Sequence, residues 1–334
     1  MGITNSALAT LWAKKYVNTL GQAEDATVHL CERIRGSLRF ASSQAWAKTE
    51  QLLAPQLEKQ RLDPDWIDPW QIAEDSRQLF KRAAGSCQTH ISPEKFSTDI
   101  ARVCGQIRQR YSSRDPRLLG FMSMQFHYTG QILLESLSPR EQSLFLPYLK
   151  VMDDHLYMPL HRCYQAAAAL ATEDTPPPLR AMQELLPAVT PIAETICADA
   201  AHAFPGYHTL GGSLSQVMVR VSSIRDVEMF QIYLGLAVLE GSIRAVQQEL
   251  FPLCVMLYPP LRVGWDLVRY LLAALEKLLP LYLSSSSYAL LAPYLQQVQG
   301  MFSTEVFPEA DSIWNHHPDV LRFLDMAQQI QSSL

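Results

Sequence analysis

Apolar residues recur at helical spacing along almost the whole chain. Cys31, Ile34, Leu38, Ala41 and Ala45 form one such stripe, with polar residues between them. An apolar residue at every third or fourth position gives an α-helix one hydrophobic face, whereas a half-buried β-strand requires strict alternation. No alternating segment rich in β-branched residues occurs in the sequence. The pattern therefore predicts an all-α fold, a multi-helix bundle of roughly a dozen helices.

Three proline-initiated helix starts support this prediction. They are Ser92-Pro93-Glu94-Lys95, Asp115-Pro116-Arg117-Leu118 and Ser138-Pro139-Arg140-Glu141. In each, a Ser or Asp oxygen can accept a free N–H of the first turn, and proline suits the first helical position because no hydrogen bond is lost there. In the third, Glu141 follows Ser138 by three residues, which predicts a capping box.

Further helices are predicted over about 5–20, from the Cys31 stripe to about Pro55, over 225–258, over 263–283, and from Pro318 onward. A short HEAT-like α-solenoid is the alternative architecture. Asp68-Pro69 recurs as Asp115-Pro116 after 47 positions, and Ser92-Pro93 recurs as Ser138-Pro139 after 46. We favour the bundle, because both dipeptides are common helix starts and no third copy follows.

The sequence divides most naturally at its proline-rich segment. Residues 172–178 end in Pro176, Pro177 and Pro178, and successive prolines favour an extended path. We therefore expect an N-terminal helical region over 1–171, a linker over 172–178 and a C-terminal helical region over 179–334. One continuous core shared by both regions is the alternative.

Composition and charge narrow the functional classes. The 334 residues are 48% hydrophobic and 18% charged with a net charge of −5, and no segment concentrates Lys and Arg, which argues against nucleic acid as a partner. No uncharged apolar run reaches the length of a transmembrane helix, although peripheral membrane contact stays open. The six cysteines are far apart and form no C-x-x-C motif, so we expect free thiols and a soluble protein of the reducing cytoplasm.

The first group of candidate residues is Asp153-Asp154-His155 with Tyr157, His161 and Tyr164. Of these, Asp153, Tyr157, His161 and Tyr164 would share one stripe of a single helix despite Pro159. Such a stripe could polarise a substrate, with Asp153, Asp154 and His161 as catalytic candidates. Asp154 and His161 are also the candidates for metal ligands. A solvated or interface face is the favoured interpretation, because the ligand patterns of di-iron bundles and prenyl synthases do not occur.

A second group, Tyr233, Glu240, Arg244 and Gln247, lies in a strongly apolar segment. If one helix carries these residues, Glu240 and Arg244 form a buried ion pair that fixes helix register, which is the favoured interpretation. The alternative is a ligand-binding site within the bundle.

Two weaker candidates complete the set. His127 lies among methionines and aromatic residues, where it could serve as a tetrapyrrole ligand or a general base, but a hydrogen-bonded core histidine is favoured. His316-His317 has no acidic or cysteine companion at metal-ligand spacing, so exposure to solvent explains it better. The wide apolar arc over 263–283 is typical of a central bundle helix.

Nucleophile-elbow, P-loop and dinucleotide-binding motifs do not occur. Abundant helical surface without a catalytic set favours a non-catalytic interaction protein, an assembly or regulatory factor that binds other proteins and needs no cofactor. The alternatives are a helical enzyme or a protein that holds a small molecule, metal or tetrapyrrole between helices, and a peripheral membrane protein. Oligomeric state is not encoded in any pattern that we identify.

Overall fold

The computed structural model describes residues 3–16, 24–170 and 175–307, and over these ranges the chain is almost entirely helical. They contain twelve α-helices and one hairpin of two-residue strands, which confirms the predicted all-α bundle. The chain forms two compact units. Among the described residues, unit 1 comprises those up to Leu179 together with Gln247–Met256, and unit 2 comprises Arg180–Val246 and those from Leu257 onward.

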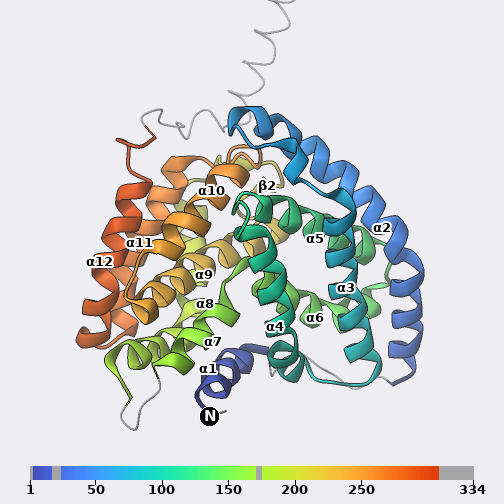
Figure 1. The fold of residues 1–334 in the computed structure, drawn as a ribbon, viewed down its shortest axis with the longest axis horizontal. Helices are drawn as coiled ribbons and strands as arrows, with labels where there is room; N and C mark the ends of the chain where they lie inside the picture. Colours follow the sequence, from blue (N-terminus) through green and yellow to red (C-terminus); the bar gives the residue numbers. More distant parts are fainter. Residues whose placement is uncertain (1–2, 17–23, 171–174, 308–334) are drawn as a thin grey trace, which may run out of the picture. The chain divides into compact units, whose positions relative to one another are not determined.

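The first seven α-helices belong to unit 1 (Figure 1). They are α1 (Ile3–Ala13, continued by the 3-10 turn η1, Lys14–Tyr16), α2 (Glu24–Lys59), α3 (Pro69–Gln88), α4 (Pro93–Ser112), α5 (Leu118–Glu135), α6 (Pro139–Tyr157) and α7 (Leu160–Ala169), with the short 3-10 turn η2 (Pro64–Trp66) before α3. Helix α2 packs on α3 and α5, α4 packs on α6, and α1 packs on α4 and α7. Because helices distant in sequence pack together, unit 1 is a bundle and not a stack of consecutive helix pairs.

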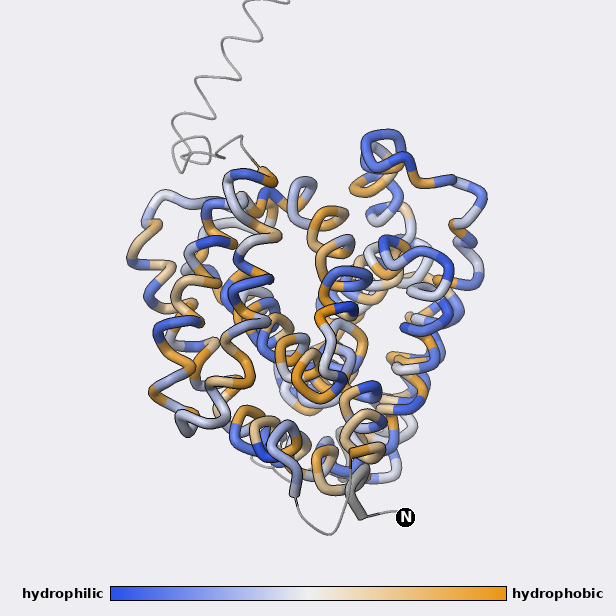
Figure 2. Tube along the Cα trace, turned by 60° about the vertical axis from the view of Figure 1, so that its left-hand side comes forward, coloured by the Kyte–Doolittle hydropathy of each residue, from blue (hydrophilic) through white to orange (hydrophobic). Residues whose placement is uncertain are grey.

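Aromatic side chains fill the interior of unit 1. Phe80 of α3 stacks on Phe126 of α5 with ring centroids 5.0 Å apart, and Phe145 of α6 lies 6.5 Å from Phe80. All three are fully buried. Figure 2 shows hydrophobic and hydrophilic stretches alternating along the helices, as expected of helices with one buried face.

Two of the three predicted helix starts are confirmed. Ser92 accepts the backbone N–H of Lys95 at 3.2 Å, and Ser138 forms the predicted capping box with Glu141. The start predicted at Asp115 is displaced. Asp115 accepts the N–H of Arg117 within a turn, and α5 begins only at Leu118. The Asp115 carboxylate also pairs with the Arg117 side chain at 2.6 Å, so it stabilises the turn before the helix instead of capping the helix itself.

Two other helix boundaries predicted from proline differ from the structure. Helix α2 continues past Pro55 to Lys59, because proline removes only one backbone donor and Gln56 beyond it is still buried against the unit. Pro177 and Pro178 lie in the first turn of α8 (Pro177–Ala203), where their missing N–H groups are no loss, so they are not extended linker. Residues 172–174 of the expected linker lie outside the described residues.

Unit 2 contains most of α8, the hairpin β1 (His208–Thr209) and β2 (Gly212–Ser213), and helices α9 (Val217–Glu240), α11 (Trp265–Tyr282) and α12 (Ser285–Met301). Helix α12 packs on α9 and α11. Helix α11 covers the segment predicted as a central helix, with six of its leucine and valine residues buried: Leu267, Val268, Leu271, Leu272, Leu275 and Leu279. No helix of the described residues is long and apolar enough to cross a membrane.

The single helix predicted over 225–258 is wrong. Helix α9 begins eight residues earlier and ends at Glu240, where Gly241 adopts a left-handed conformation with φ of 61°. The N–H of Ser242 then bonds the carbonyl of Ala237, a closing bond typical of glycine-terminated helices. A π-helical turn η3 (Val246–Leu250) and α10 (Phe251–Leu257) follow.

Candidate functional site

A buried charged group of unit 1 surrounds Asp154 of α6. Its side chain is fully buried and accepts three hydrogen bonds or ion-pair contacts. Tyr16 Oη donates to Oδ2 at 2.6 Å, Lys15 Nζ lies 3.1 Å from Oδ2, and Lys150 Nζ lies 2.6 Å from Oδ1. A buried carboxylate is tolerated only when it is paired, and here both oxygens are occupied.

The Trp12 ring contacts both Lys15 and Tyr16, the partners of Asp154 from the N-terminal segment. Trp12 Nε1 donates to Tyr16 Oη at 3.1 Å, and Lys15 Nζ lies 4.0 Å from the centroid of the Trp12 ring. Burial works to raise the pKa of Asp154, but the charges of Lys15 and Lys150 and their hydrogen bonds outweigh it and hold the pKa below its usual range. Asp154 is therefore ionised at neutral pH and ties α1 and η1 to α6.

His155, the next residue, is buried in a different environment. Its Nε2 lies 2.9 Å from Ser97 Oγ of α4, and its ring centroid lies 6.4 Å from that of Tyr164. Burial lowers the pKa of His155 to about 4, so the imidazole is neutral at pH 7. Within the described part of the chain, His155 Nδ1 and Tyr164 Oη are buried without a hydrogen-bond partner.

The helix expected to carry Asp153, Tyr157, His161 and Tyr164 is in fact two helices. Helix α6 ends at Tyr157, Met158 is extended with ψ of 146°, and α7 begins after Pro159. The break follows from proline, which disfavours the helical conformation of the residue before it.

The two tyrosines do not lie on the solvated or interface face that the sequence predicts. Tyr157 and Tyr164 are buried, while Asp153 and His161 are half-buried. The ring of His161 lies against Gly105 of α4, where an added Cβ would meet it at 2.5 Å. Asp154 contacts Lys15, Tyr16 and Lys150. No three His, Cys, Asp or Glu residues gather as a metal site in the described ranges.

A second charged group, which the sequence patterns did not reveal, involves Arg108 of α4. Its guanidinium is buried, donates to the carbonyl of Leu156 and lies 3.5 Å from Glu249 Oε2. Arg162 Nη1 of α7 lies 2.5 Å from Glu249 Oε1. Arg108 thus satisfies a carbonyl at the end of α6, and Glu249 connects it to α7. No sequence pattern marks this group, because Glu249 is 141 positions from Arg108.

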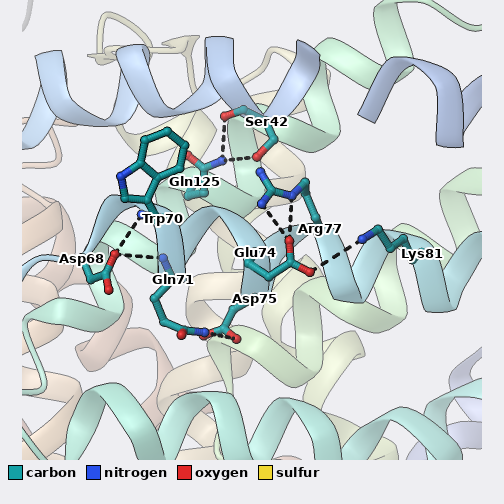
Figure 3. A network of polar contacts seen from close by, with 9 residues as sticks. All are labelled: Ser42, Asp68, Trp70, Gln71, Glu74, Asp75, Arg77, Lys81 and Gln125. Carbon is teal, nitrogen blue, oxygen red and sulfur yellow. Dashed lines mark hydrogen bonds and ion pairs between the residues drawn. The ribbon is translucent and has the colours of Figure 1, made fainter. Parts of the chain in front are cut away.

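A third polar group lies along α3 and is partly drawn in Figure 3. Asp75 is buried and accepts from Gln71 Nε2 at 3.0 Å, from Arg110 Nη1 at 2.5 Å and from Tyr111 Oη at 2.7 Å. Burial and the hydrogen bond to Asp75 raise the pKa of Tyr111 above its usual range. At the start of the helix, Asp68 Oδ1 accepts the backbone N–H groups of Trp70 and Gln71 at 3.0 Å.

The remaining contacts of Figure 3 are structural. Glu74 pairs with Arg77 at 2.7 Å and with Lys81 at 3.6 Å on the outer face of α3, and Gln125 Nε2 of α5 donates to the carbonyl of Ser42 at 2.9 Å. The ion pairs of Glu74 lie within α3, and the hydrogen bond of Gln125 joins α5 to α2.

The structure separates the residues of the second candidate group, and it places His127 apart from the other candidates. Tyr233 is buried in α9, Glu240 is the half-buried last residue of that helix, and Arg244 and Gln247 are exposed beyond its end. The expected buried Glu240–Arg244 pair is therefore wrong, because Gly241 ends the helix between them. His127 is half-buried on α5, with its ring 5.5 Å from that of Tyr128. His316-His317 lies outside the described residues.

The buried carboxylates of Asp154 and Asp75 accept hydrogen bonds from other side chains of the protein. Among the candidate residues in the described ranges, the buried atoms without a hydrogen-bond partner are His155 Nδ1 and Tyr164 Oη. Comparisons of the chain with protein-family models, curated proteins and solved structures found no match.

Proposed function

We propose that this chain is a non-catalytic helical interaction protein that binds another protein through the start of α9. The observation that carries the proposal is a group of exposed apolar side chains in unit 2, which we call the α9 patch. Val217 is 76% exposed, Met218 52% and Val221 45%, and Leu210 of the neighbouring hairpin is 47% exposed. Clustered exposed apolar residues are typical of interaction sites, whereas isolated ones are ordinary.

The elements beneath the α9 patch are firmly anchored. Val219, on the opposite side of the same turn, is buried, and the position of a Cβ on Gly211 in the hairpin would lie 3.3 Å from it. The backbone N–H of Leu210 donates to the carbonyl of Leu261 at 2.8 Å. A rigid, preformed apolar surface loses little conformational entropy on binding.

Charge around the α9 patch favours an acidic protein partner. No Asp or Glu occurs between Asp199 and Asp226, whereas Arg220 and Arg262 are exposed beside the patch and the hairpin. We infer a partner segment with an apolar face flanked by carboxylates. Two exposed arginines are too few for stable attachment to an anionic membrane, where each cation contributes about 1 kcal/mol.

The experiment replaces Val217 with a photo-crosslinking benzophenone amino acid in the full chain, expressed in the cells that naturally make it. A captured protein is then purified and titrated against the wild type, Val221→Asp and the matched control Leu281→Asp. Leu281 is 75% exposed on α11, so the control carries the same change at an equally accessible site of unit 2.

We expect Val221→Asp to weaken binding at least tenfold, about 1.4 kcal/mol, and Leu281→Asp to bind like the wild type. Equal affinities for all three proteins would refute the proposal, as would crosslinks to lipid alone. Crosslinks only to a second copy of the chain would replace the acidic partner with self-association.

A second candidate, a polar ligand held inside unit 1, is favoured by the two open valences of His155 and Tyr164. Buried polar groups without partners are uncommon, and a bound ligand or water would satisfy both. Native mass spectrometry of the protein purified from its own cells tests this function. A bound molecule that is lost in Tyr164→Phe and kept in Tyr128→Phe would support it, and a mass equal to that of the chain alone would reject it.

A further inference from the structure

Two of the six cysteines lie together between neighbouring helices. Cys31 of α2 and Cys87 of α3 are both free and buried, with exposed fractions of 0% and 3%. Helix α2 packs along α3 in unit 1 (Figure 1). Cys31 Sγ donates to the carbonyl of Ala84 at 3.0 Å, one turn before Cys87, which places the Cys31 thiol against the face of α3 that carries Cys87.

The two thiols also affect each other's pKa. The neighbouring Cys87 thiol lowers the pKa of Cys31 against the opposing effect of burial, and the nearby Arg35 charge lowers it further. The Cys31 thiol and burial raise the pKa of Cys87. This asymmetry is favourable for thiol–disulfide exchange, in which one sulfur attacks as a thiolate and the second later resolves the mixed disulfide.

We propose that Cys31 and Cys87 form a redox-responsive pair that closes to an intramolecular disulfide when the chain meets a low-molecular-weight disulfide such as oxidised glutathione. The Cys31 thiolate attacks one sulfur of the oxidant, and the first thiolate of the oxidant leaves. Cys87, deprotonated, then attacks Cys31 Sγ and expels the second. Two cysteine thiols are oxidised, one external disulfide is reduced to two thiols, and the two cysteine protons end on the released thiols.

The end of α3 controls access to the pair. Cys87 is the next-to-last residue of α3, and the connection to α4 begins with Thr89 and with His90, which has a φ of 53°. Helix ends open more readily than helix centres, so opening of this last turn exposes both sulfurs without unfolding unit 1. Exchange should therefore be slower than for an exposed thiol but faster than global unfolding.

The test incubates the native full-length protein with oxidised glutathione, blocks remaining thiols by alkylation under denaturing conditions, and measures intact mass and the crosslinked peptides. The variants are Cys31→Ser, Cys87→Ser and the matched control Cys104→Ser, which removes a fully buried thiol of α4. Circular dichroism verifies that each variant folds, and Cys31→Ala replaces any serine variant of Cys31 that does not.

We expect the wild type and Cys104→Ser each to lose two alkylatable thiols, to yield a peptide that joins Cys31 to Cys87, and to recover both thiols with dithiothreitol. Neither single variant of the pair should form an internal disulfide. Six alkylated thiols in the treated wild type would overturn the proposal, as would a disulfide between other cysteines or loss of two thiols in Cys87→Ser.

Discussion

Replacing His155 by Gln should remove a specific part of the acid sensitivity of this protein. Gln stays neutral at all pH values and can still reach Ser97 Oγ, the partner of His155 Nε2. Burial lowers the pKa of His155 from 6.5 to about 4 in the folded chain. Below pH 6.5 the unfolded chain therefore binds a proton that the folded chain does not, so stability falls with pH until the folded imidazole also protonates near pH 4.

The size of this effect follows from the two pKa values. A tenfold difference in proton affinity is about 1.4 kcal/mol, so the full difference between 6.5 and 4 amounts to about 3 kcal/mol. About 2 kcal/mol of it is lost between pH 7 and pH 5. His155 is fully buried, so solvent does not screen the effect. Asp154, whose pKa is lowered, loses its contribution only below about pH 4 and leaves this window unaffected.

Urea unfolding followed by tryptophan fluorescence at pH 7 and pH 5 measures the effect as a difference between proteins. The free energy of unfolding of the wild type should fall by about 2 kcal/mol more than that of His155→Gln, while Tyr128→Phe should follow the wild type. If the wild type and His155→Gln lose equal stability over this interval, the imidazole is not held neutral by burial and our reasoning about the site is refuted.

Three further predictions concern packing, capping and the discarded ion pair. Gly105→Ala should cost about 1–3 kcal/mol of stability because the new Cβ would meet the His161 ring at 2.5 Å. Gly85→Ala, whose Cβ would meet nothing within 4 Å, should stabilise the protein by about 0.5–1 kcal/mol. Thermal unfolding of both variants tests this contrast, and equal shifts of the melting temperature would contradict it. Ser138→Ala should cost about 1 kcal/mol through loss of the capping box, and an unchanged urea midpoint would show that the cap contributes nothing. Arg244→Ala should change stability by less than about 0.5 kcal/mol because the side chain is exposed, and a loss of 3 kcal/mol or more would restore the buried pair.

The sequence by itself determined the helical class and several helix ends of this protein. Apolar spacing and N-terminal caps are local, so Ser92 and Ser138 could be identified from a few neighbouring residues. Local signals were wrong where two of them compete. Helix α2 continues past Pro55 because residues beyond it are buried. At Gly241, one residue in the left-handed conformation ends an apolar helix that periodicity alone would continue.

The tertiary structure decided which polar residues meet. Asp154 was a candidate in the sequence, but its ligands Lys15 and Tyr16 lie 138 or more positions away, and Glu249 lies 141 positions from Arg108. The pairing of Cys31 with Cys87 likewise depends on how α2 packs against α3. Such contacts have no local signature, because burial and partner choice arise only when helices distant in sequence pack together and exclude water from the charges between them.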